Sequence, residues 1–96
     1  MPTPHALSVD EIMQLVSAWG KAAANAVKAG FDLVEIHSAH GYLLHQFLSP
    51  LSNKRNDEFG GTLENRSRFL NLVIKEVRNN IPDEMPLFLK IGRAHV

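Results

Sequence analysis

The order of apolar patterns along the chain constrains its fold more than any other feature. Helical spacing over residues 9–29 is followed by a short apolar run at 32–37, and the same succession returns at 63–79 and 87–91. A helix between two short buried strands is typical of a βαβ unit, whose strands are parallel neighbours joined by a right-handed crossover. We therefore expect an α/β fold.

The first helix has clear signals at both ends. Ser8 and Glu11 form a capping-box pair at its start, and Gly30 follows its last turn as a favourable C-terminal residue. We expect Trp19 to lie in the core, because it belongs to an apolar stripe at three- and four-residue spacing. The stripe comprises Ile12, Leu15, Val16, Trp19, Ala22, Ala23, Ala26 and Val27.

A short helix over residues 42–48 and a long irregular segment over 49–61 separate the two halves of the chain. Loops of this length inside a compact domain are usually functional or cover something. Thr62 is placed to cap the next helix, which we expect over 63–79. We expect the polar residues of this region to hold the loop by hydrogen bonds and ion pairs; they are Asn53, Arg55, Asp57, Asn65 and Arg66.

The two expected strands need more cover than this chain provides. Parallel strands are covered on both faces and paired along their edges. Here the chain starts on a helix without a preceding strand and ends on a strand without a following helix. We therefore expect an excerpt of a larger α/β protein, in the form of a barrel.

Composition excludes several classes of protein. Ten basic and ten acidic residues cancel, so the electrostatic footprint of a nucleic-acid binder is missing. The sequence has no cysteine, which excludes disulfides, thiolate metal sites and a cysteine nucleophile. Its apolar runs are far shorter than the roughly 20 residues that span a bilayer, and no signal peptide is recognisable. We expect a soluble cytoplasmic protein with no nucleic-acid or membrane partner; nothing in the sequence specifies an oligomeric state.

Polar side chains gather where the first expected strand ends, in the run His37-Ser38-Ala39-His40-Gly41-Tyr42. Active sites of parallel α/β barrels lie at the C-terminal ends of strands. Three interpretations stay open: a metal site, for which no further ligand completes a set; satisfied polar residues without function; and a site that binds a developing oxyanion and delivers a proton. Imidazole N–H groups suit the oxyanion, and a tyrosine with a pKa of about 10 suits a strongly basic carbanion.

The run from Ala29 to Leu44 resembles the strand-four signature of the Old Yellow Enzyme family. The same family pattern continues through Gln46-Phe47-Leu48-Ser49-Pro50, then Asn53, Arg55, Asp57, Gly60-Gly61 and Glu64-Asn65-Arg66. The resemblance covers residues 6–91. It implies a partial TIM (β/α)8 barrel comprising roughly the third helix, fourth strand, fourth helix and fifth strand, so that residues 1–91 are an internal fragment of an FMN-binding oxidoreductase domain.

What the resemblance implies about chemistry is specific. Family members reduce FMN with NADPH or NADH, then reduce the activated C=C bond of small α,β-unsaturated carbonyl or nitro compounds. His37 and His40 fall on the pair that binds the substrate oxygen, as in the His-x-x-His branch. Tyr42 falls on the tyrosine that protonates the substrate α-carbon. No metal site is implied by these residues.

Lys90 falls where the family usually has an arginine that contacts the flavin, and we expect it to bind the cofactor. The family pattern then departs, so we expect residues 92–96 to be an atypical tail, foreign or misread. The resemblance places the first-strand residues and the phosphate grip outside this chain, and the isolated chain is expected to be inactive. The alternative is a catalytically inactive fragment that acts as a binding or assembly module.

Overall fold

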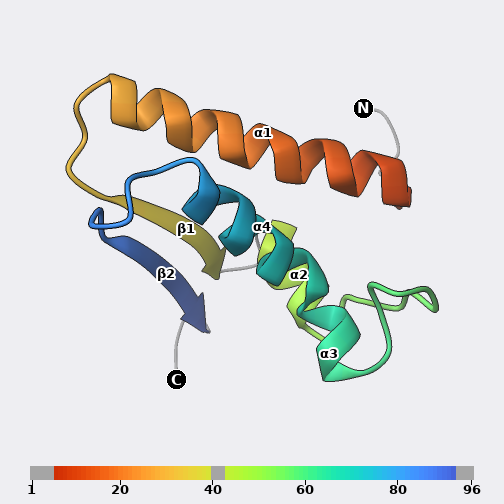
Figure 1. The fold of residues 1–96 in the computed structure, drawn as a ribbon. Coiled ribbons are helices and arrows are strands. Elements are labelled where there is room, and N and C mark those ends of the chain that lie inside the picture. Colours follow the sequence, from red (N-terminus) through yellow and green to blue (C-terminus); the bar gives the residue numbers. More distant parts are fainter. Residues whose placement is uncertain (1–5, 40–42, 93–96) are drawn as a thin grey trace, which may run out of the picture.

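The computed structural model describes residues 6–39 and 43–92, which form an α/β arrangement with helices packed on one face of a small parallel sheet (Figure 1). The long helix α1 lies along one side, and the two strands run next to each other in the same direction. The elements in chain order are α1 (Val9–Lys28), β1 (Val34–Ala39), α2 (Leu43–Leu48), α3 (Leu63–Arg66), α4 (Arg68–Asn79) and β2 (Leu87–Gly92).

The predicted parallel pairing of the strands is confirmed. Partners run in register from Val34 with Leu87 to Ala39 with Gly92. The expected bounds of the first strand, residues 32–37, were wrong by two residues at each end. Pairing decides these bounds: the first residue with a partner is Val34, whose N–H donates to the Pro86 carbonyl at 3.2 Å.

The start of α1 has the capping box that the sequence predicts. The Glu11 amide donates to Ser8 Oγ at 3.1 Å, and the Ser8 amide donates to Glu11 Oε1 at 2.8 Å. These bonds satisfy two backbone donors that the first turn would otherwise leave without a partner. At the other end, Gly30 takes a φ of 94°, which an L side chain rarely adopts.

Helices α1 and α4 pack together over the buried face of the sheet. Gly20 permits this close approach, because a Cβ at that position would lie 2.7 Å from Cγ of Glu76 on α4. Trp19 meets Phe69 edge-on, with ring centroids 5.8 Å apart, which confirms its expected place in the core. The fully or nearly fully buried apolar residues are Ile12, Val16, Ala23, Ile36, Leu44, Phe47, Phe59, Phe69, Leu70, Val73, Val77 and Ile81.

The single helix expected over 63–79 is instead two helices that meet at Ser67. The first, α3, is capped by Thr62 as expected, and its Arg66 is held by the carbonyls of Leu48 and Gly61. The second, α4, directs its apolar side toward α1. We attribute the break at Ser67 to these different partners of α3 and α4. Apolar spacing predicts a single helix, because it contains no information on the backbone contacts of Arg66.

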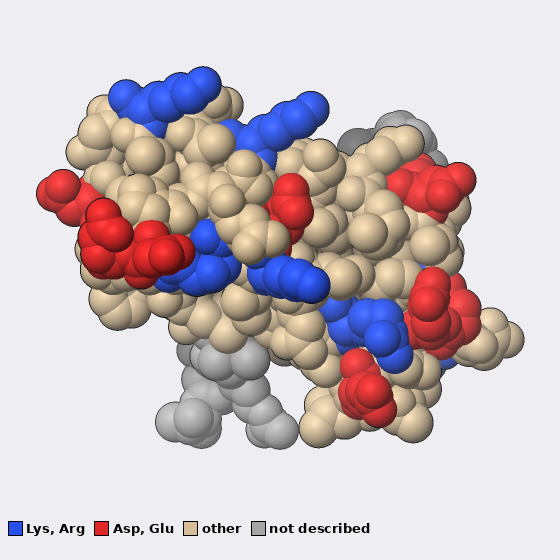
Figure 2. Space-filling model, viewed as in Figure 1, with Lys and Arg blue, Asp and Glu red and all other residues tan. Residues whose placement is uncertain are grey.

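Charges of both signs are intermixed over the visible face of the molecule (Figure 2), in keeping with the balanced composition. No helix within the described ranges is long and apolar enough to cross a membrane.

Candidate active site

The side chains of β1 alternate between a buried and an exposed face. Ile36 is 2% exposed and Ser38 is fully buried, whereas Glu35 and His37 are exposed. Successive side chains of a strand point to opposite faces. Ile36 and Ser38 therefore point toward the helices, and His37 points away from them.

The register of the sheet brings two of the predicted site residues together. His37 is the partner of Lys90, and Glu35 is the partner of Phe88. Partners in a parallel pair share a face, so all four side chains lie on the side of the sheet opposite the helices. Phe88 is 52% exposed there, which is a large uncovered apolar surface for a strand residue. Within the described part of the chain, this face has no layer over it.

The buried face holds a polar contact at the same level. Ser38 Oγ donates a hydrogen bond of 2.8 Å to the carbonyl oxygen of Lys90. This contact lies one residue from the end of β1, directly behind the position where the side chains of His37 and Lys90 emerge. The sequence interpretation assigned no role to Ser38; the signal was a hydroxyl at an alternation position otherwise occupied by apolar residues.

His40 and Tyr42, the other two predicted site residues, lie outside the described residues. In the sequence they fall between β1, which ends at Ala39, and α2, which begins at Leu43. Leu44 and Phe47 of α2 are buried in the core, so this short helix is packed against the rest of the molecule.

Asn53 ties the end of α2 to the long loop. The residue is 9% exposed, and its side-chain amide donates to the carbonyls of Phe47 at 2.7 Å and Phe59 at 2.8 Å. Its Oδ1 accepts the amide of Arg55 at 3.0 Å. The Asn53 side chain thus satisfies three backbone groups from three parts of the chain. The loop also passes close to itself, since a Cβ at Gly60 would lie 2.3 Å from the Arg55 carbonyl oxygen.

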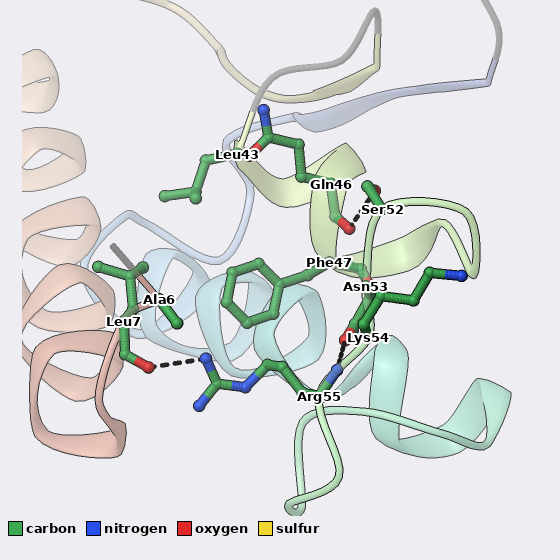
Figure 3. A pocket seen from close by; sticks show the side chains of 9 residues that line it. All are labelled: Ala6, Leu7, Leu43, Gln46, Phe47, Ser52, Asn53, Lys54 and Arg55. Carbon is green, nitrogen blue, oxygen red and sulfur yellow. Dashed lines mark hydrogen bonds between the residues drawn. The ribbon is translucent and has the colours of Figure 1, made fainter. Parts of the chain in front are cut away.

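Arg55 extends the same set of contacts toward the start of α1 (Figure 3). Its guanidinium forms two hydrogen bonds with the Asp57 carboxylate, at 3.0 and 2.6 Å. The same group donates to the Leu7 carbonyl at 2.7 Å, the contact drawn in Figure 3. It also lies over the Phe47 ring, 5.6 Å from the centroid. The hydrogen bond from Arg55 lowers the pKa of Asp57 below its ordinary value. The predicted role of these polar residues in holding the loop is confirmed.

Comparison with known proteins identifies the family of this chain. Residues 1–95 match the NADH:flavin oxidoreductase / NADH oxidase family. The chain belongs to this family, which includes the Old Yellow Enzymes.

Individual members of this flavin oxidoreductase family are similar in sequence to the chain over nearly its whole length. The chain is 54% identical over 90 residues to the NADPH dehydrogenase of Clostridium acetobutylicum, covering 94% of this chain and 26% of that protein. It is 51% identical over 92 residues to the NADPH dehydrogenase of Bacillus subtilis, covering 96% and 27%. A NADH:flavin oxidoreductase of Gibberella zeae is 48% identical over 91 residues, covering 95% and 22%. The chain thus spans about a quarter of the length of these flavin oxidoreductase relatives.

Two pockets among the described residues are lined by neither His37 nor Lys90. A pocket of about 190 Å³ lies between the start of α1 and the long loop (Figure 3). Of the two cations that line it, Lys54 and Arg55, the second is paired with Asp57. A wider, mainly apolar one of about 350 Å³ opens between α1 and β1. The first is lined by Ala6, Leu7, Leu43, Gln46, Phe47, Ser52, Asn53, Lys54 and Arg55.

Metal-ligating side chains do not gather anywhere in residues 6–39 and 43–92. No three His, Asp or Glu side chains there lie close enough to hold an ion. The candidate site among these residues is the pair of His37 and Lys90, each two residues before the end of its strand.

Proposed function

We propose that this chain is part of an FMN-dependent oxidoreductase that uses NADPH or NADH to reduce the activated C=C bond of small α,β-unsaturated carbonyl or nitro compounds. Membership of the flavin oxidoreductase family supports the reaction class. The observation that carries the proposal is the pairing of His37 with Lys90 on the uncovered face of the sheet, where the parallel strands end.

The proposed setting is a (β/α)8 barrel, of which residues 1–91 are an internal fragment. In this assignment α1 is the third helix, β1 the fourth strand, α4 the fourth helix and β2 the fifth strand. The face that holds Glu35, His37, Phe88 and Lys90 then lies inside the barrel. Active sites of such barrels lie at the C-terminal ends of the strands, which is where His37 and Lys90 lie. The exposure of Phe88 supports a missing layer of side chains over this face.

Each residue of the proposed site has a distinct task. Negative charge grows on the substrate oxygen as hydride adds to the β-carbon, and the N–H groups of His37 and His40 donate hydrogen bonds to that oxygen. Tyr42 delivers a proton to the α-carbon, where its high pKa matches a strongly basic acceptor. These contacts strengthen as charge develops, so they stabilise the transition state more than the substrate.

The residues present fit FMN in charge and place. Lys90 is exposed two residues before the end of β2, on the same face as His37, so its ammonium is available to an anionic edge of a flavin. A lysine supplies the positive charge but not the planar fork with which an arginine forms two parallel hydrogen bonds. When bound, FMN supplies the hydride; the chain supplies the hydrogen bonds, the proton and the cation.

The test uses the full-length protein, with the sequence on both sides of this chain restored. We expect the purified protein to show flavin absorbance and to oxidise NADPH or NADH in the presence of an enone. Tyr42→Phe should slow enone reduction by about 10²-fold or more, while NAD(P)H still reduces the flavin at the normal rate.

His37→Ala should instead raise the KM for the enone along with its loss of turnover, because it removes a donor to the substrate oxygen. A folded, colourless full-length protein would contradict the proposal and would favour a role as a binding or assembly module. A coloured protein that reduces enones equally well without Tyr42 would contradict the assigned proton donor.

A further inference from the structure

Ser38 is the most deeply buried polar side chain among the described residues, with no exposed surface. A buried hydroxyl costs free energy unless it forms a hydrogen bond, and alanine would occupy the same position without that cost. Ser38 forms its bond across the sheet, to the carbonyl oxygen of Lys90 at 2.8 Å. The hydroxyl therefore joins the two strands by a side-chain contact in addition to their backbone ladder.

The hydrogen bond from Ser38 lies next to both described residues of the proposed site, His37 and Lys90. Ser38 directly follows His37 in β1, and its acceptor is the backbone of Lys90 itself. Ser38 lies one residue before the end of β1, and Lys90 lies two residues before the end of β2. Ends of secondary structure elements open most easily, so an additional cross-strand bond has most effect there.

We propose that Ser38 is a positioning residue: its hydroxyl holds the ends of β1 and β2 together from the buried face, and so fixes the separation of His37 and Lys90 on the opposite face. This role rests on the proposed function, because His37 binds the substrate oxygen and Lys90 the cofactor there. If the strand ends part, the oxygen donor and the flavin-binding cation move relative to each other. Small displacements of this kind lower the rate of a step that needs close alignment.

The experiment compares Ser38→Ala with Ser8→Ala in the full-length protein. Both variants remove one serine hydroxyl that forms one hydrogen bond to the backbone, but Ser8 lies at the start of α1, away from the strand ends. We expect Ser38→Ala to speed hydrogen exchange of the Ile91 and Gly92 amides by about fivefold, which corresponds to one lost hydrogen bond. Ser8→Ala should leave exchange at these amides unchanged.

The activity measurements separate positioning from mere stabilisation. Ser38→Ala should lower kcat for enone reduction by about fivefold with bound flavin retained, whereas Ser8→Ala should leave kcat unchanged at a similar loss of thermal stability. Ser38→Thr, which keeps the hydroxyl, should recover the slow exchange and most of the turnover.

Either of two results would overturn the role of Ser38: exchange at the end of β2 unaltered in Ser38→Ala, or turnover in Ser38→Ala no lower than in Ser8→Ala. These outcomes differ from a failure of the proposed function, which would appear as an unmutated protein that binds no flavin or reduces no enone.

Discussion

Replacing Asn53 with alanine should release the long loop over residues 49–61. The substitution removes the donor to two carbonyls, those of Phe47 and Phe59, and the acceptor of the Arg55 amide. Each net hydrogen bond contributes about 0.5–1.5 kcal/mol, and a buried group left without a partner costs about 1–3 kcal/mol. Since Asn53 is 9% exposed, water reaches these groups only after some opening. We expect the loop to open at a cost lower by about 2–3 kcal/mol.

Limited proteolysis of the full-length protein measures this opening directly. Trypsin cleaves after lysine or arginine, and Lys54 and Arg55 are the two residues that follow Asn53. When opening and closing are fast relative to cleavage, the cleavage rate follows the population of the open form. A change of about 2–3 kcal/mol then raises cleavage after Lys54 or Arg55 on the order of 30- to 150-fold.

Two further variants make the result specific. Asn56→Ala alters an exposed asparagine of the same loop and should leave the cleavage rate unchanged. Asn53→Asp keeps an acceptor for the Arg55 amide but loses both donors, so it should be cleaved about as fast as Asn53→Ala. An aspartate variant as resistant as the unmutated protein would refute the reasoning, because the two donor bonds would then contribute nothing.

Three other predictions concern charge and completeness. Lys90→Met in the full-length protein should weaken FMN binding and Lys90→Arg should preserve or strengthen it, as measured by flavin released on dilution; equal retention in both would exclude a role for the charge. Since Arg55 lowers the pKa of Asp57 below 3.8, the contribution of Asp57 to loop stability is complete above that value and is lost as the pH falls through the lower folded pKa. Cleavage of the loop by pepsin should therefore rise below about pH 4, and Asp57→Asn should remove this part of the pH dependence while leaving the loop more easily cleaved at higher pH. The isolated 96-residue chain should retain no FMN on purification, and a yellow preparation would contradict this.

Local signals in the sequence predicted the local parts of the fold. The capping box of Ser8 and Glu11 fixes the first residue of α1, because both partners lie within one turn. The short apolar run at 32–37 indicated a strand, and the crossover rule gave its parallel partner. The bounds of β1 were missed because they depend on where β2 begins to pair, which a pattern within β1 does not contain.

Long-range contacts account for the other differences. The break at Ser67 follows from Arg66 binding the carbonyl of Leu48, 18 residues away, and helical periodicity carries no record of such a contact. Among the candidate site residues, the place of His37 toward the C-terminal end of a strand could be predicted from the sequence, although the strand continues for two more residues. Its pairing with Lys90 required the register between the strands. The role of Ser38 needed both the register and the burial of its side chain.

The alternation of side chains from Glu35 to Ser38 in β1 makes the candidate site intolerant of a change in strand length. A single residue inserted before Ile36 would turn every later side chain of the strand to the other face. The imidazole of His37 would then face the apolar core between α1 and α4, and the hydroxyl of Ser38 would face the open side next to Lys90. Substitutions can adjust this strand one side chain at a time, whereas an insertion or deletion exchanges its packing surface and its chemical surface in one step. Variation in length is therefore expected in the loop over residues 49–61 before it is tolerated in Val34–Ala39.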